Sequence, residues 1–248
     1  MRAEYSRGRY LATFRMLDAM HLSREQSTPA ATATFEHTAA ALRASCDGAT
    51  CAAVCRRLNG VVDAKIDALR QEGAGVACAP GCDYCCHLRV DVFPHEATAL
   101  LHYLRTRAAP ADAASIEQKI RANAARIDTL TAQQHRTAGI PCAFLSAGLC
   151  SAHDVRPSSC ATYHSMSRAR CEHAFNNPAD IGTPRNARPA LLELQAFNAA
   201  QIEATSAARK AVGLAGEQVE LHQALRALLD GGAGVTVSVG GARAEPKP

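Results

Sequence analysis

The spacing of apolar residues along the chain predicts a mainly α-helical protein. Over residues 5–20, apolar side chains recur at steps of three and four, which is the period of an amphipathic helix. A polar break and an Ala-rich segment over residues 35–44 follow. A longer helical pattern then covers residues 54–69, and Gly73 ends it.

Further elements follow along the chain. Apolar and charged residues alternate over residues 88–92, which predicts a short strand. Pro94 suits the first position of a helix and Asp112 is placed to cap the next one, so we expect an antiparallel helix pair. Two more helical patterns, over residues 191–202 and 221–229, are each followed by glycine.

Residues 139–184 differ from the rest because they show no sustained period. They contain four prolines and four cysteines. A long irregular stretch inside a compact domain needs something to order it, and bound metal would do so. We therefore expect a mainly α fold with an irregular cysteine-rich metal-binding core, flanking helices and at most a short β element.

These patterns divide the chain into four parts. We expect residues 1–75 to form an N-terminal helical segment and residues 76–175 to form the cysteine-cluster metal-binding region. Residues 176–232 should supply C-terminal helices that pack on the same domain. Residues 233–248 should form a flexible tail, in which alternating valines could add an edge strand.

Composition narrows the class of protein. Aromatic residues make up only 4% of the 248 residues and Trp is absent, so the core must be built mostly from Ala, Leu, Val and Ile. The net charge of +4 comes from scattered arginines, which does not favour a nucleic-acid partner. No signal peptide or membrane-spanning apolar run is present, so we expect a cytoplasmic protein whose thiols stay reduced.

Cysteine is the most informative residue type, because eight of the eleven cysteines fall in two groups with the spacing of metal ligands. Thiolates separated by two or three residues can be brought around one ion by a tight loop, and Pro80 and Gly81 supply such a loop. These residues, called the eight clustered cysteines below, are Cys78, Cys82, Cys85, Cys86, Cys142, Cys150, Cys160 and Cys171.

The spacing of the cysteines does not identify the metal. Eight thiolates could hold two zinc ions, two iron–sulfur clusters, or one cluster and a smaller site. The adjacent pair Cys85 and Cys86 would serve two centres, or a bridge, more easily than one tetrahedral ion. Arginines near the cysteines could offset the thiolate charge, and these are Arg89, Arg156, Arg168 and Arg170.

Other candidate ligands are less well placed. Cys51 and Cys55 would share a helix face near Cys46, but a helical cysteine usually behaves as a small buried hydrophobic residue. Five histidines lie near the clustered cysteines, with His164 and His87 as the first substitutes for a cysteine that does not bind. The other three are His95, His153 and His173.

Taken together, the motifs resemble the YkgJ-like cysteine-cluster family over roughly residues 76–175. The resemblance rests on Cys78-Ala-Pro-Gly-Cys82-Asp-Tyr-Cys85-Cys86, Val90, Val92, Glu96-Ala97, Cys142-Ala-Phe144-Leu145, Gly148, Cys150, Arg156-Pro157, Cys160, Tyr163 and Cys171. It implies a zinc- or iron-chelating domain. The chain departs from the family at Ala161, where the family often has Arg. Flagellin lysine methylases are similar to the family in their cysteine pattern, so the resemblance also admits an enzyme.

The sequence predicts the function of the protein only in general terms. We expect a metal-binding protein that holds zinc or an iron–sulfur cluster; the alternative is an iron–sulfur-dependent enzyme, either an oxidoreductase or a methylase-like protein-modifying activity. The CxxxCxxC spacing also matches radical-SAM enzymes, but the chain lacks the repeated strand–helix units of their barrels. A thiol switch would need exposed cysteines of low pKa. No nucleophile–base pair or phosphate-binding loop stands out in the sequence, so it identifies neither a substrate nor a protein partner.

Overall fold

The computed structural model describes residues 28–180, 190–214 and 217–231. Helices dominate this part of the chain, which confirms the predicted mainly α class. The predicted helix over residues 5–20 and the predicted tail over residues 233–248 lie outside the described residues.

Most of the predicted helices are present. Residues 28–44 are helical, and α2 (Gly48–Gln71) covers the long pattern and ends before Gly73, whose φ is +90°. The other helices are α3 (Pro94–Thr106), α4 (Pro110–Asp128), α5 (Ala132–Thr137), α6 (Ser158–Ala161), α7 (Arg168–Asn176), α8 (Leu192–Ala211) and α9 (Leu221–Gly231), with 3-10 turns η1 (Tyr84–His87) and η2 (His153–Val155). Residues 139–180 are therefore less irregular than expected.

Two short antiparallel pairs make up the β structure of the described residues. β1 (Asp91–Val92) pairs with β4 (Val219–Glu220), and β2 (Leu145–Ser146) pairs with β3 (Leu149–Cys150). Only the end of the strand predicted over residues 88–92 forms, and its partner between α8 and α9 was not predicted. The first pair ties the C-terminal helices to the segment that follows η1.

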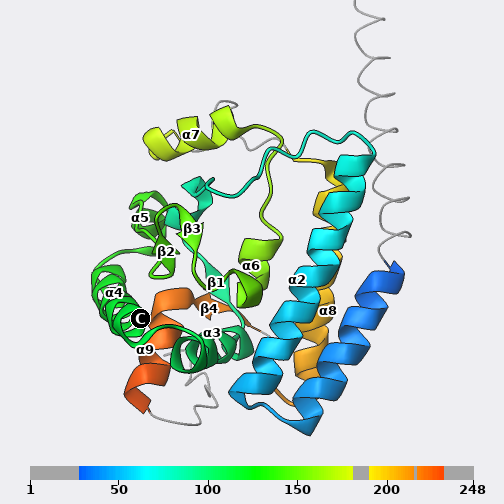
Figure 1. Cartoon of the computed structure of the whole chain (residues 1–248), viewed down its shortest axis with the longest axis horizontal. Helices are drawn as coiled ribbons and strands as arrows, with labels where there is room; N and C mark the ends of the chain where they lie inside the picture. Colours follow the sequence, from blue (N-terminus) through cyan, green and yellow to red (C-terminus); the bar gives the residue numbers. More distant parts are fainter. Residues whose placement is uncertain (1–27, 181–189, 215–216, 232–248) are drawn as a thin grey trace, which may run out of the picture.

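Helix α2 lies at the centre of the packing. It contacts α3, η2, α6 and α8, and Figure 1 shows it in cyan between α8 and the left half of the molecule. At its first residue, a Cβ on Gly48 would lie only 2.6 Å from the Cβ of His102. Because real Cβ atoms do not approach so closely, glycine permits this contact between α2 and α3.

The predicted start of α3 is confirmed, whereas the predicted start of α4 is not. Pro94 begins α3 as expected, and the Glu96 carboxylate accepts a hydrogen bond from the Phe93 backbone N–H at 2.8 Å. The cap predicted at Asp112 is wrong, because α4 already begins at Pro110 and Asp112 lies in its first turn. The predicted antiparallel pair is also wrong: α3 packs on α2 and α9, and α4 packs on α9.

Two clusters of buried side chains form the core. The larger one joins α2, α3, α4 and α9 to the segment around Phe144, and the smaller one joins α2 to α8 through Val62, Leu194 and Phe197. Apart from Phe144, the buried side chains of the larger cluster are aliphatic or belong to cysteine. None of the helices in the described part of the chain is long and apolar enough to cross a membrane.

Candidate metal centre

The first cysteine loop is joined to the segment between α6 and α7. Ala77 N–H donates to the Ser165 carbonyl at 2.8 Å, and Ser165 N–H lies 3.3 Å from the Cys78 sulfur. Gly81 has a φ of +81°, the left-handed conformation expected for this tight loop. The loop that carries Cys78 therefore lies directly against a segment almost ninety residues further along the chain.

Helix α7 brings Cys171 to the same place. The Phe175 ring centroid lies 5.6 Å from that of Tyr84 and 4.8 Å from that of His87, and the Arg168 guanidinium lies 5.9 Å from the Tyr84 ring. Tyr84 and His87 are the two ends of η1, which carries the adjacent cysteine pair. Aromatic packing thus holds α7 on η1.

A hairpin brings together two cysteines of the second group. Leu145 N–H donates to the Cys142 carbonyl at 3.0 Å, and Leu145 faces Cys150 across the β2–β3 pair. The turn between the strands has positive φ at Ala147 and Gly148, as a tight two-residue hairpin requires. Cys142 and Cys150 are therefore held close together, at the base of the hairpin.

Cys160 reaches this group through α6. The buried Glu96 carboxylate, on α3, accepts a hydrogen bond from the backbone N–H of Ser158 at 2.7 Å, and Ser158 is the first residue of α6. The Ser159 hydroxyl donates to the Asp91 carbonyl at 2.6 Å. These two contacts fix the short helix that carries Cys160 against β1 and the start of α3.

The two groups meet at η1. Cys142 N–H donates to the Cys86 carbonyl at 2.8 Å. At the tip of the hairpin, a Cβ on Gly148 would lie 3.9 Å from Gly81 in the first loop, which is ordinary van der Waals contact. Direct contacts thus link the first loop and η1 to α7 and to the hairpin, and α6 is joined to this group through β1 and the start of α3.

Electrostatics shows which thiols lie near one another. Burial is the main cause that raises the pKa of Cys78 and Cys82, and a negative charge on Cys85 would raise both further. Burial also raises the pKa of Cys142 to about 12 and that of Cys150 and Cys160, again with a contribution from the Cys85 charge. Cys85 therefore lies within electrostatic reach of both groups.

Three arginines place positive charge beside these thiols. Arg70 donates to the Cys78 carbonyl at 2.5 Å. Burial raises the pKa of Cys78, Cys82 and Cys150, and the positive charges of Arg70, Arg168 and Arg156, respectively, oppose part of that rise. Arg70 was not predicted, although a basic residue in the last turn of α2 was visible in the sequence. Of the other predicted arginines, Arg89 forms an ion pair with Asp91 and Arg170 lies in α7.

The five candidate histidines have other neighbours. The buried His95 lies 3.0 Å from the Arg209 guanidinium, and burial, followed by that charge, lowers its pKa to about 3. The remaining pairs are His87 with the Asp83 carbonyl, His153 with Arg156, His164 with Asn198 and His173 with Asp180.

The three remaining cysteines lie away from the centre. Cys51 and Cys55 are buried in the larger core cluster, and burial raises the pKa of both thiols, that of Cys51 to about 12. Cys46 is exposed, and its sulfur lies 3.3 Å from the Leu42 carbonyl. This agrees with the interpretation of Cys51 and Cys55 as small core residues.

The donor set fits a metal, but the described side chains are not closed around one. Eight soft thiol donors, on residues of intermediate exposure, are carried by segments that pack around η1. Within residues 28–180, 190–214 and 217–231, no three His, Cys, Asp or Glu side chains are arranged to hold an ion. Binding would therefore require the thiols to lose their protons and turn toward a common point.

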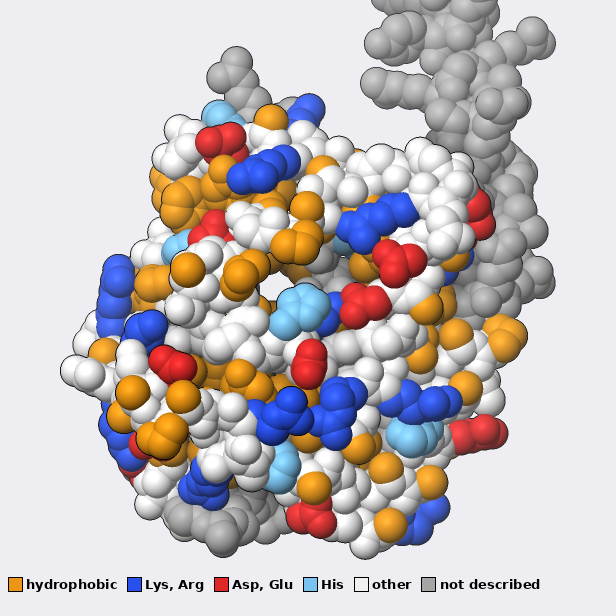
Figure 2. Space-filling view, in the orientation of Figure 1, with side chains coloured by type: hydrophobic (Ala, Val, Ile, Leu, Met, Phe, Trp, Pro, Cys, Tyr) orange, Lys and Arg blue, Asp and Glu red, His pale blue; other side chains and the backbone are white. Residues whose placement is uncertain are grey.

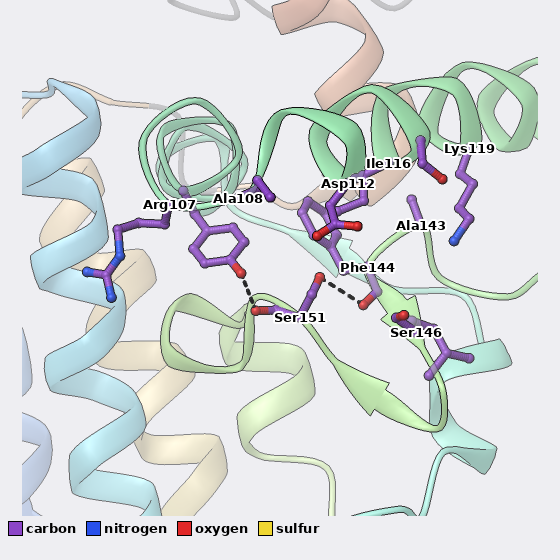
Figure 3. Close-up of a pocket in the computed structure, with 13 residues that line it drawn as sticks. Arg107, Ala108, Asp112, Ile116, Lys119, Ala143, Phe144, Ser146 and Ser151 are labelled. Atoms are coloured by element: carbon purple, nitrogen blue, oxygen red, sulfur yellow. Dashed lines mark hydrogen bonds between the residues drawn. The ribbon is translucent and has the colours of Figure 1, made fainter.

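A cavity of about 230 Å³ lies beside the hairpin. Figure 3 shows Asp112 directed into it above Phe144 and Ser151, with Lys119 on one side. The Tyr103 hydroxyl donates to the Ser151 carbonyl at 2.5 Å, which joins α3 to the end of the hairpin. The hairpin that carries Cys150 is thus also a wall of this cavity.

No single kind of charge dominates the described part of the face that Figure 2 presents. On the face that Figure 2 presents, basic, acidic and histidine side chains are interspersed. Several of the charges are paired, as in Arg156 with Asp63 and Arg226 with Asp128.

One sequence comparison covers this part of the chain. Residues 77–182 match the family model CxxCxxCC, which is described as a "putative zinc- or iron-chelating domain". Neither a curated protein nor a solved structure matches the chain. The matched residues contain all eight clustered cysteines, whereas Cys46, Cys51 and Cys55 lie outside them.

Proposed function

Because the chain carries a domain of the YkgJ-like cysteine-cluster family over residues 77–182, we propose that it binds zinc or an iron–sulfur cluster through thiolates drawn from the eight clustered cysteines. The observation that carries this proposal is the convergence of η1, the β2–β3 hairpin, α6 and α7. Each of these elements supplies at least one cysteine, and Ser165, Phe175 and Glu96 make the contacts that hold them together.

The state of the thiols supports a role as ligands. No disulfide joins the cysteines that the structure describes, so their sulfur atoms remain available as metal ligands. Burial raises the pKa of most clustered thiols, so at neutral pH they are protonated without metal, and the ion must displace these protons. The charges of Arg70, Arg156 and Arg168 would offset part of the negative charge that then develops.

A second candidate function uses the same site. The cavity next to the hairpin would give a small substrate a place near an iron–sulfur cluster, in an enzyme that acts as an oxidoreductase or as a methylase-like protein-modifying enzyme. Zinc would exclude this redox function, because Zn²⁺ has no redox chemistry, whereas an iron–sulfur cluster absorbs visible light and changes on reduction.

Serine substitutions test the ligand set. We expect serine at Cys82, Cys150 or Cys160 to lower the metal bound per chain, because a hydroxyl is a poor substitute for a thiolate ligand. The matched control is Cys46→Ser, which changes an exposed cysteine outside the matched family domain and should leave the metal content unchanged.

Metal content is measured by elemental analysis on folded protein, with circular dichroism to verify the helix content of each variant. Equal loss of metal from Cys46→Ser and Cys150→Ser would show that the division of the cysteines is wrong.

A further inference from the structure

A second cavity, of about 210 Å³, adjoins the one beside the hairpin. Tyr103 and Arg107, one turn apart at the end of α3, line both cavities. Figure 3 shows the Arg107 side chain extending away from Asp112 toward α2, and α2 supplies Ala52 and Arg56 to the second cavity. The second cavity therefore brings an arginine from the end of α3 and an arginine from α2 to the same space.

The walls of the second cavity are held in place by contacts between distant segments. The Tyr103 hydroxyl donates to the Ser151 carbonyl at 2.5 Å, which fixes the ring that separates the two cavities. His102 also lines the second cavity, and the close contact of its Cβ with Gly48 lets α2 approach α3. Arg56 lies about two helical turns after Gly48. The approach of the two helices thus sets the position of Arg56 beside the end of α3.

Neither arginine of the second cavity pairs with an acidic residue in the described part of the chain. The side chains of Arg56 and Arg107 form no ion pair or hydrogen bond with any of these residues, whereas Arg156 and Arg226 each pair with an aspartate. Asp154 lines the second cavity as well, but it pairs with neither arginine. Like charges that face one cavity repel each other, and an anion between them would relieve this repulsion.

The charges around the second cavity favour a monoanion. The formal charges of Arg56, Arg107 and Asp154 sum to +1, with His102 counted as neutral, and the C-terminal end of α3 adds partial negative charge. One carboxylate would neutralise this charge, whereas a phosphate group, which carries about 1.5 to 2 negative charges at neutral pH, would leave an excess. The planar guanidinium group also matches a carboxylate, because it can donate two parallel N–H···O bonds.

Two buried apolar residues complete the second cavity. Ala52 is 1% exposed and Val155 is 2% exposed, so they form an apolar floor below the charged side chains. A hydrocarbon group attached to the carboxylate would lie against this floor and lose contact with water.

We propose that the second cavity binds a small carboxylic acid, whose carboxylate is held between Arg56 and Arg107 and whose hydrocarbon part lies on Ala52 and Val155. This site uses α2, α3 and η2 and none of the clustered cysteines, so it is independent of the proposed metal centre.

The test is a titration of the full chain with propionate, followed by NMR of the arginine side-chain N–H groups and of the backbone amides of α3. Propionamide is the matched ligand, because it has almost the same shape but no charge. We expect propionate to give saturable shifts at both arginines and to bind at least about tenfold more tightly than propionamide, since hydrogen bonds between charged groups are the stronger ones. Inorganic phosphate should bind more weakly than propionate.

Substitutions locate the site. Arg56→Gln and Arg107→Gln should each weaken propionate binding at least about tenfold. The matched control is Arg105→Gln, which changes an exposed arginine of the same helix that lines neither of the two cavities and should leave propionate binding unchanged. Asp154→Asn should tighten propionate binding by up to about fivefold, because it removes a like charge. Circular dichroism verifies that each variant is folded.

Propionate that causes no saturable shift, or that binds no more tightly than propionamide, would overturn the site. Tighter binding of phosphate than of propionate would overturn its assignment to a carboxylate. Equal weakening by Arg105→Gln and Arg107→Gln would overturn its location. None of these results changes the metal content of the chain, which tests the proposed function separately.

Discussion

Replacing Glu96 by alanine should lower the free energy of unfolding by about 2–6 kcal/mol, because each of two buried N–H groups would lose its acceptor at about 1–3 kcal/mol. The carboxylate is 1% exposed and accepts from Phe93 at 2.8 Å and from Ser158 at 2.7 Å. One side chain thus closes the first turn of α3 and fixes the start of α6. The buried Arg209 would also lose a neighbouring negative charge.

The same substitution should reduce metal binding, because Ser158 begins the short helix that carries Cys160. Glu96→Gln keeps one carbonyl acceptor and should fall between the alanine variant and the unaltered chain in denaturant unfolding. The matched control is Glu203→Ala on α8, whose exposed side chain should change stability by no more than about 0.5 kcal/mol. Equal stability of the Glu96 and Glu203 variants would contradict this role of Glu96.

Removing the metal should loosen residues 139–180 more than α2 or α8. The hairpin, η2, α6 and α7 are short elements held by contacts around the cysteines, and metal binding to a site absent from the unfolded chain contributes to folding. We expect amide hydrogen exchange there to become at least about tenfold faster after chelation, which corresponds to about 1.4 kcal/mol of local stability.

The chelation experiment has an internal control. Cys82→Ser protein should already exchange faster near η1, and the chelator should add less to it than to the unaltered chain. Exchange that stays unchanged over residues 139–180 after verified metal removal would show that metal does not order this region.

Local rules predicted the elements that depend on few residues. Proline at the first position of α3 and the glycine that follows α2 act within one turn, so their signals are visible in the sequence. β4 was not predicted, because a strand of two residues is too short to show an alternation of apolar and polar residues. It forms through pairing with β1. Asp112 was assigned as a cap although Pro110 starts α4 two residues earlier.

The sequence groups the eight clustered cysteines as candidate ligands, but it does not predict how the segments that carry them are arranged. Spacing selected the eight clustered cysteines, and the family match covers all of them. The contact of Ser165 with Cys78 and that of Glu96 with Ser158 join segments far apart in sequence. Such contacts depend on tertiary packing, for which spacing along the chain carries no signal.

The most direct test is the metal content of the full chain purified without oxygen, measured by elemental analysis together with a visible spectrum. We predict stoichiometric zinc in colourless protein, or iron with matching sulfide in coloured protein that bleaches on reduction. Folded, fully reduced protein that carries neither metal, and takes up neither when both are supplied, would contradict the account.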